Sequence, residues 1–118
     1  MIEDHPIYKE VEEAYYDCAH DDDPLEIRLK RRNLSFRASQ AVDRDTSFAI
    51  LENLVPGYNN FCPELLLHLP EGCEIFIARE GSVCLYVKGK LPKKLWRKLD
   101  SDEWDYSDQS DETRIWWD

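Results

Sequence analysis

Residues 73–90 read CEIFIAREGSVCLYVKGK, and this stretch decides the fold. Two runs of branched and aromatic side chains flank a Glu-Gly-Ser turn, which is typical of two antiparallel strands. We take Glu80–Gly81 as the loop, so that Arg79 faces Ser82. One face then carries Phe76, Ala78, Val83, Leu85 and Val87, and the other carries Ile75, Ile77, Cys84 and Tyr86. Because both faces are apolar, we expect a central hairpin that is covered on both sides.

A second candidate hairpin lies upstream. Residues 25–31 (LEIRLKR) alternate apolar and charged side chains, which predicts a half-buried strand. Residues 34–38 alternate with the opposite parity, and a turn near residues 31–33 would join the two runs as a hairpin over 25–38. A helix across residues 25–36 is the competing interpretation.

Four other segments have helical spacing or helix-boundary residues. Residues 6–19 carry one apolar stripe after Asp4, which is suited to cap a helix. The other three segments are residues 45–55, 63–69 and 91–99. With hairpins over 25–38 and 73–88, these segments predict an α+β fold in which a small, mostly antiparallel sheet packs with three to four amphipathic helices. We expect residues 1–118 to form a single domain.

The charge is negative and unevenly distributed. Twenty-five acidic and fifteen basic residues give a formal net charge of −10 at pH 7. Residues 100–118 are strongly acidic, whereas residues 88–99 contain basic and no acidic residues. Nucleic acids and anionic membranes are bound through cations, so this balance argues against both partners unless one basic face is isolated. It favours a basic partner, whose approach the field of the protein would accelerate.

The C-terminal segment 100–118 (DSDEWDYSDQSDETRIWWD) mixes acidic and aromatic residues, unlike a disordered acidic tail. One interpretation packs Thr113–Trp117 on the core as a last strand or docked segment. The other leaves some rings exposed as anchors, toward which the aspartates steer a basic protein. On that hypothesis the partner-binding residues are Asp21, Asp22, Asp23, Asp102, Glu103, Trp104, Asp105, Tyr106, Asp108, Asp111, Trp116 and Trp117.

The chain lacks the Walker, GxGxxG, HExxH and GxSxG motifs. Its four cysteines have no CxxC spacing and the acidic first ten residues do not resemble a secretory leader, so we expect reduced thiols and a cytoplasmic protein. Cys62 with His68 is the candidate catalytic pair, and Cys18 with His20 is a zinc candidate of unusual spacing. We predict no enzymatic activity, no cofactor and no metal site.

The favoured hypothesis is a non-enzymatic acidic protein that binds and blocks a basic macromolecule, in particular a nucleic-acid-acting protein. Imitation of nucleic-acid charge is one form of it. In size and charge, though in no motif, the chain resembles nuclease-toxin immunity proteins and phage-borne inhibitors of host defence. The alternatives are a subunit or adaptor that docks into a larger assembly through its aromatic C-terminus, and a small hydrolase. We expect neither direct nucleic-acid binding nor membrane contact.

Overall fold

The computed structural model describes residues 1–19, 35–58 and 60–118. These residues form a five-stranded antiparallel sheet in the order β1-β2-β3-β5-β4, which confirms the predicted α+β class. The strands are β1 (Ser35–Arg37), β2 (Ile75–Glu80), β3 (Val83–Lys88), β4 (Glu103–Ser107) and β5 (Glu112–Trp116). The helical elements are η1 (Ile2–Asp4), α1 (Pro6–Ala19), α3 (Arg44–Leu54), η2 (Pro63–His68) and α4 (Lys94–Leu99).

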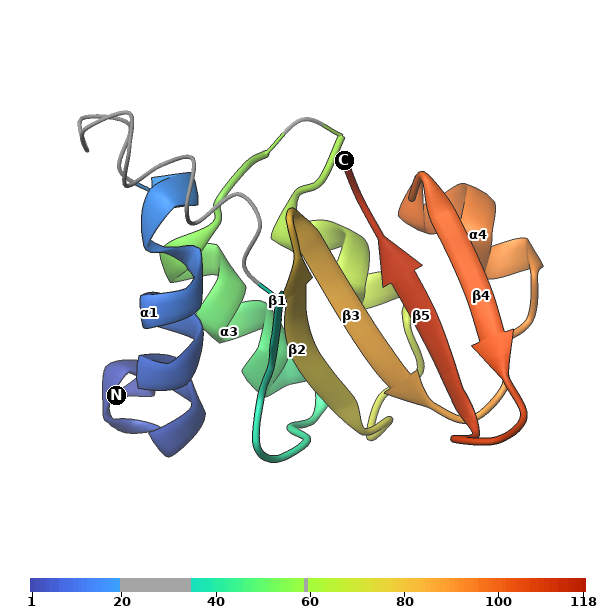
Figure 1. Ribbon diagram of the computed structural model, residues 1–118, viewed down its shortest axis with the longest axis horizontal. Helices are drawn as coiled ribbons and strands as arrows, with labels where there is room; N and C mark the ends of the chain where they lie inside the picture. The colour runs from blue at the N-terminus through green and yellow to red at the C-terminus, as the bar shows by residue number, and fades with distance from the viewer. Residues whose placement is uncertain (20–34, 59) are drawn as a thin grey trace.

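The helices pack on one face of the sheet and at its β1 end, and Figure 1 shows α3 and α4 behind the strands and α1 beside β1. α1 packs on α3 and β2 at the β1 end, while η2 joins α3 to α4. The strand side chains turned toward the helices are fully buried: Ile75, Ile77, Val83, Leu85, Val87 and Ile115. Removal of this apolar surface from water is the main force that holds the layers together. We call the opposite side of the sheet, which no described helix covers, the open face.

The β2–β3 hairpin confirms the predicted turn and lies in the middle of the sheet, but described helices cover one of its faces rather than both (Figure 1), and its register differs by one residue. Arg79 pairs with Val83 rather than Ser82. The reason is that the loop centres on Gly81, whose φ of 73° suits glycine. A hydrogen bond from the Glu80 N–H to the Ser82 C=O closes this loop. A shift of one residue exchanges the faces of one strand relative to the other. The open face therefore receives Phe76, Ala78, Glu80, Cys84, Tyr86 and Lys88.

The two longer helices begin where polar side chains accept hydrogen bonds from backbone N–H groups of the first turn. In α3 the Asp43 carboxylate accepts from the Thr46 N–H at 2.7 Å, so the helix starts slightly earlier than the sequence predicts. At the start of α1 the His5 Nδ1 accepts from the Ile7 N–H at 3.1 Å, and it does so in place of the expected cap, Asp4. In the described part of the predicted apolar stripe of α1, Ile7, Val11, Ala14 and Tyr15 are buried.

The remaining predicted helices are short. Residues 63–68 form a 3-10 helix, η2, and the helix expected over 91–99 starts only at Lys94, beyond Pro92. None of the described helices is both long and apolar enough to span a membrane. Of the hairpin predicted over 25–38, β1 falls within the described residues, whereas residues 25–34 lie outside them, as does most of the alternative helix.

Candidate functional site

The β4–β5 hairpin occupies one end of the sheet and carries the acidic segment that the sequence singles out (Figure 1). Six carboxylates line β4 and the turns at its two ends. We call this set the acidic edge. All six residues are exposed, and they are Asp100, Asp102, Glu103, Asp105, Asp108 and Asp111. All but Asp100 belong to the predicted partner-binding set, and the hairpin brings them together.

Arg114 is the cation that β5 places among these carboxylates. Its Nη1 lies 2.7 Å from Glu103 and 3.5 Å from Asp105, and its Nη2 lies 2.8 Å from Glu80 on the open face. Burial lowers the pKa of Arg114, but the hydrogen bonds to Glu80 and Glu103 outweigh this effect and raise it, so the guanidinium stays charged. One positive charge is thus shared by three negative charges.

The other members of the acidic edge form no ion pair with a described residue. Asp102 accepts a hydrogen bond from the Asp118 N–H at 2.8 Å, and Asp111 accepts one from the Tyr106 hydroxyl at 2.8 Å. Neither contact neutralises a carboxylate. The acidic edge therefore keeps a strong net negative charge.

Two of the predicted anchor rings are buried instead. Trp117 has no exposed surface, its Nε1–H donates to the Leu99 C=O at 2.8 Å, and its ring meets Phe61 edge-on at 4.9 Å. Trp104 is 9% exposed and stacks on Trp96 at 6.4 Å. Neither ring is available as the partner anchor that we predicted, because both complete the core under the sheet. The interpretation that Thr113–Trp117 packs on the core is confirmed.

The other two rings reach the surface on opposite sides of the sheet. Tyr106 is 37% exposed, and the Lys90 Nζ lies 5.5 Å from its ring centre. Trp116 is half-buried on the open face, where its Nε1–H donates to the Glu80 C=O at 3.0 Å. Tyr106 is therefore the more accessible of the two. The remaining predicted residues, Asp21–Asp23, lie outside the described residues.

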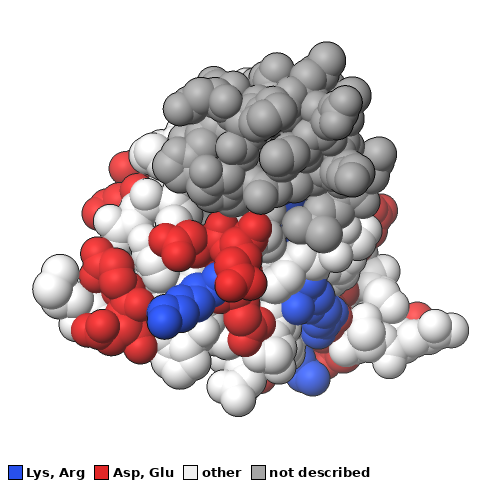
Figure 2. All heavy atoms as spheres, turned by 60° about the vertical axis from the view of Figure 1, so that its left-hand side comes forward, with Lys and Arg blue, Asp and Glu red and all other residues white. Residues whose placement is uncertain are grey.

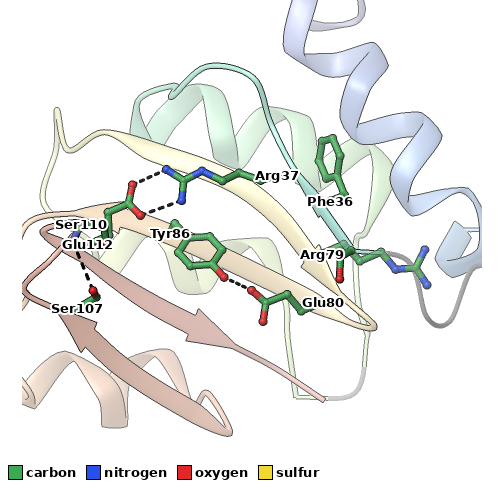
Figure 3. Close-up of a pocket in the computed structure, with 9 residues that line it drawn as sticks. Phe36, Arg37, Arg79, Glu80, Tyr86, Ser107, Ser110 and Glu112 are labelled. Atoms are coloured by element: carbon green, nitrogen blue, oxygen red, sulfur yellow. Dashed lines mark hydrogen bonds and ion pairs between the residues drawn. The ribbon is translucent and has the colours of Figure 1, made fainter.

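Next to the hairpin, the open face is hollowed by a depression of about 610 Å³ (Figure 3). Arg37 reaches across it from β1 and donates to both carboxylate oxygens of Glu112 on β5, with Nη1 at 2.8 Å. The guanidinium lies 4.1 Å from the ring centre of Phe76 and 4.9 Å from that of Tyr86. The Tyr86 hydroxyl donates to Glu80, and Arg79 points out of the depression toward α1.

The groups in this depression are ion-paired rather than poised for proton transfer. The hydrogen bonds from Arg37 lower the pKa of Glu112. Burial raises the pKa of Glu80, but the hydrogen bonds from Arg114 and Tyr86 outweigh it, and the net shift is downward. Burial and the charge of Glu80 raise the pKa of the Cys84 thiol to about 12, so little thiolate forms at neutral pH.

The candidate catalytic pair has no activated member. Burial and the neighbouring Glu64 raise the pKa of the Cys62 thiol, and His68 is exposed. No hydrogen bond joins Cys62 to His68. No three His, Cys, Asp or Glu side chains among the described residues are placed to hold a metal ion, and the side chains of Cys18 and His20 lie outside them.

The sequence analysis missed the ion-paired residues of the open face, Arg37, Glu80, Glu112 and Arg114. The position of Glu80 could have been predicted with the correct hairpin register, which puts Glu80 and Tyr86 on the same face of the sheet. Comparison with protein-family models, with curated proteins and with solved structures finds no match for the chain.

Proposed function

We propose that this is a non-enzymatic protein that binds and blocks a basic macromolecule, namely a protein whose cationic surface binds nucleic acid. The observation that carries the proposal is the acidic edge, where Arg114 pairs with two of six exposed carboxylates and the other four form no ion pair with a described residue. Such a surface attracts a cationic partner over long range and disfavours acidic ones. Held on β4 and the turns at its two ends, the carboxylates need little ordering when a partner binds.

The backbone of the acidic edge supports a role for its charge. Asp100 and Asp111 have φ angles of 51° and 53°, in the left-handed region where glycine is the most stable residue. Aspartate at both positions retains two negative charges at a conformational cost. Aspartate in place of glycine at these two positions is consistent with a role for the negative charges in binding a partner.

A second acidic area lies at the other end of the sheet, over η1 and α1. Figure 2 shows acidic side chains gathered on this side, with basic ones between them. The exposed carboxylates include Glu3, Asp4, Glu12 and Glu13, and Lys9 lies among them in the chain. Because it resembles the acidic edge in charge but not in backbone structure, this area provides a matched control.

Docking through the aromatic C-terminus has less support. Ile115 and Trp117 are fully buried, so deletion of residues 115–117 would disrupt the core whatever the protein binds. The deletion therefore cannot separate an assembly subunit from an inhibitor, and replacement of exposed carboxylates is the sharper test.

The experiment compares affinity capture from the native host by three proteins. The first is the wild type, and the second carries Asp102→Asn, Asp105→Asn, Asp108→Asn and Asp111→Asn. The third carries the same number of charge-neutralising changes on the second acidic area, at Glu3, Asp4, Glu12 and Glu13. We expect the wild type and the third protein to capture the same basic partner, and the second to lose it. Added salt should weaken capture, and the purified partner's activity should fall in proportion to bound protein.

Capture of neutral or acidic proteins, binding that strengthens with salt, or equal loss in both neutralised proteins would contradict the proposal.

A further inference from the structure

The outer side of β4 offers unpaired backbone groups. Within the described sheet β4 is an edge strand, and Figure 1 shows no strand beyond it. The Trp117 N–H donates to the Val83 C=O at 2.9 Å, so the odd-numbered residues of β5 turn their peptide groups toward β3. The even-numbered ones turn toward β4, where the Trp116 C=O accepts from the Asp102 N–H at 2.9 Å.

The register then decides which groups of β4 are free. Glu103 pairs with Trp116 and Asp105 with Arg114, so both bond to β5. Trp104 and Tyr106, which alternate with them, direct their N–H and C=O groups away from the sheet. No hydrogen bond joins these outward groups to a described residue. The edge thus presents two donors and two acceptors at the spacing of a strand.

The side chains on the two faces of β4 differ in chemistry. On the open face, Glu103 and Asp105 have 52% and 70% of their side-chain surface exposed. On the helix face lie Trp104 and the exposed ring of Tyr106, with Lys90 against that ring. Figure 1 shows α4 behind β4, and the exposed residues of α4 and its N-cap include Lys93, Lys94, Arg97 and Lys98. A neighbouring strand would therefore meet carboxylates on one face and the Tyr106 ring beside Lys90 on the other.

We propose that β4 binds an extended segment of the partner by strand addition, and that this segment alternates basic with apolar residues. Its arginines or lysines lie beside Glu103 and Asp105, and its apolar side chains lie on the helix face beside the exposed ring of Tyr106. Backbone hydrogen bonds supply affinity, and the alternation supplies specificity. The inference rests on the proposed function, and it adds how the basic partner is held.

A second copy of this chain is the less favourable occupant. Antiparallel pairing of two β4 strands would set Glu103 and Asp105 of one copy against the same carboxylates of the other. Like charges on neighbouring strands destabilise the pair. A basic segment meets the same carboxylates with opposite charge.

The test uses two labelled seven-residue peptides with blocked ends and identical composition. In the first, arginine and valine alternate, and in the second they form two separate blocks. Fluorescence anisotropy at low salt gives both affinities. We expect the alternating peptide to bind at least about tenfold more tightly, since only it can add as a strand and match both faces.

Two variants separate the backbone from the side chain. Tyr106→Thr removes the ring and keeps the outward N–H, whereas Tyr106→Pro also removes that N–H, a change that edge strands tolerate. We expect Tyr106→Pro to bind the alternating peptide about tenfold more weakly than Tyr106→Thr. In the wild-type protein, the peptide should slow hydrogen exchange at the Trp104 and Tyr106 amides, a readout that does not depend on the folding of a variant.

The outcomes distinguish this inference from the proposed function. If both peptides bind equally, the two amides stay unprotected and salt still weakens binding, strand addition is wrong and charge attraction stands. If neither peptide binds while a basic partner is captured through the acidic edge, strand addition is likewise overturned. A stable dimer of the free protein with protected Trp104 and Tyr106 amides would assign the edge to a second copy.

Discussion

At the scale of single residues, Arg37 and Glu112 form the contact that spans most of the sheet. The pair joins β1 to β5 over β2 and β3, and the Glu112 side chain is 7% exposed while that of Arg37 is 42% exposed. A buried carboxylate depends on its partner, because removal of the cation leaves an uncompensated charge.

Arg37→Gln should therefore destabilise the protein by about 1–3 kcal/mol near pH 7. The guanidinium lowers the pKa of Glu112 from its ordinary value of 4.5, so its stabilisation is present above that pH and is lost as pH falls through the folded-state pKa. The penalty of the substitution should shrink as pH falls below 4.5. Urea unfolding across this range measures it, with the exposed Arg97→Gln as the control. A penalty independent of pH would show that packing, not the ion pair, is lost.

Trp117 supplies a second prediction at this scale. Trp117→Phe keeps a ring against Phe61 but leaves the buried Leu99 C=O without its donor, which should cost about 1–3 kcal/mol. Trp96→Phe, at a 38% exposed indole, is the matched control and should cost less. Thermal unfolding of the two variants gives the comparison, and an equal or smaller loss at Trp117 would contradict its role in the core.

Single residues also limit what the sequence can predict. Trp116 ends β5 and Trp117 continues its pairing with β3, so one ring faces the helices and the other the open face, and composition does not say which. The choice depends on the pairing of β5 with β3, a contact between segments far apart in the chain. The acidic surroundings of these rings suggested exposure, but those carboxylates belong to β4 and its turns.

At the scale of elements, local pattern predicts most of what the structure shows. Residues 75–88 form the expected hairpin, and α1 has the expected bounds. β4 was missed, although Glu103–Ser107 (EWDYS) alternates charged and aromatic residues as a half-buried strand does. The one-residue error in the β2–β3 register came from the loop around Gly81, because turn geometry sets register in a hairpin.

The end of α4 carries a prediction about backbone conformation. Asp100 terminates the helix at a φ of 51°, and its carboxylate lies at the negative end of the helix dipole. Asp100→Gly should raise the free energy of unfolding by about 0.5–1 kcal/mol, since glycine adopts this conformation without strain. Asp100→Ala, which removes the charge but not the strain, should give no such gain. Chemical denaturation of both variants distinguishes backbone strain from charge.

At the scale of the whole molecule, the fold class follows from the pattern of strands and helices, whereas the distribution of charge follows from the sheet order. Negative charge gathers at both ends of the sheet, over α1 (Figure 2) and along β4, where the carboxylates of the acidic edge are exposed. The open face between them is largely neutralised by Arg37 and Arg114. Acidic segments of the sequence predict that acidic surfaces exist, but they do not predict which carboxylates form an ion pair with an arginine.

Self-repulsion from the net charge of −10 should make the fold more stable as salt is added. The melting temperature should rise by a few degrees between about 10 mM and about 200 mM sodium chloride, where screening becomes effective over short distances. The protein with four asparagines on the acidic edge should show a smaller rise. A melting temperature that falls with salt would mean that the arginine–carboxylate pairs dominate instead.

The sheet order β1-β2-β3-β5-β4 has a consequence for how the chain reaches this fold. A short turn closes each of the hairpins β2–β3 and β4–β5. Either hairpin can therefore form early, because closing its loop costs little entropy. The pairing of β3 with β5 requires the chain through α4 to fold back first. We therefore expect this nonlocal pairing to be the slow step of folding. Substitutions that weaken the pairing of β3 with β5, such as Thr113→Ala, should slow folding only if this pairing is already formed in the folding transition state.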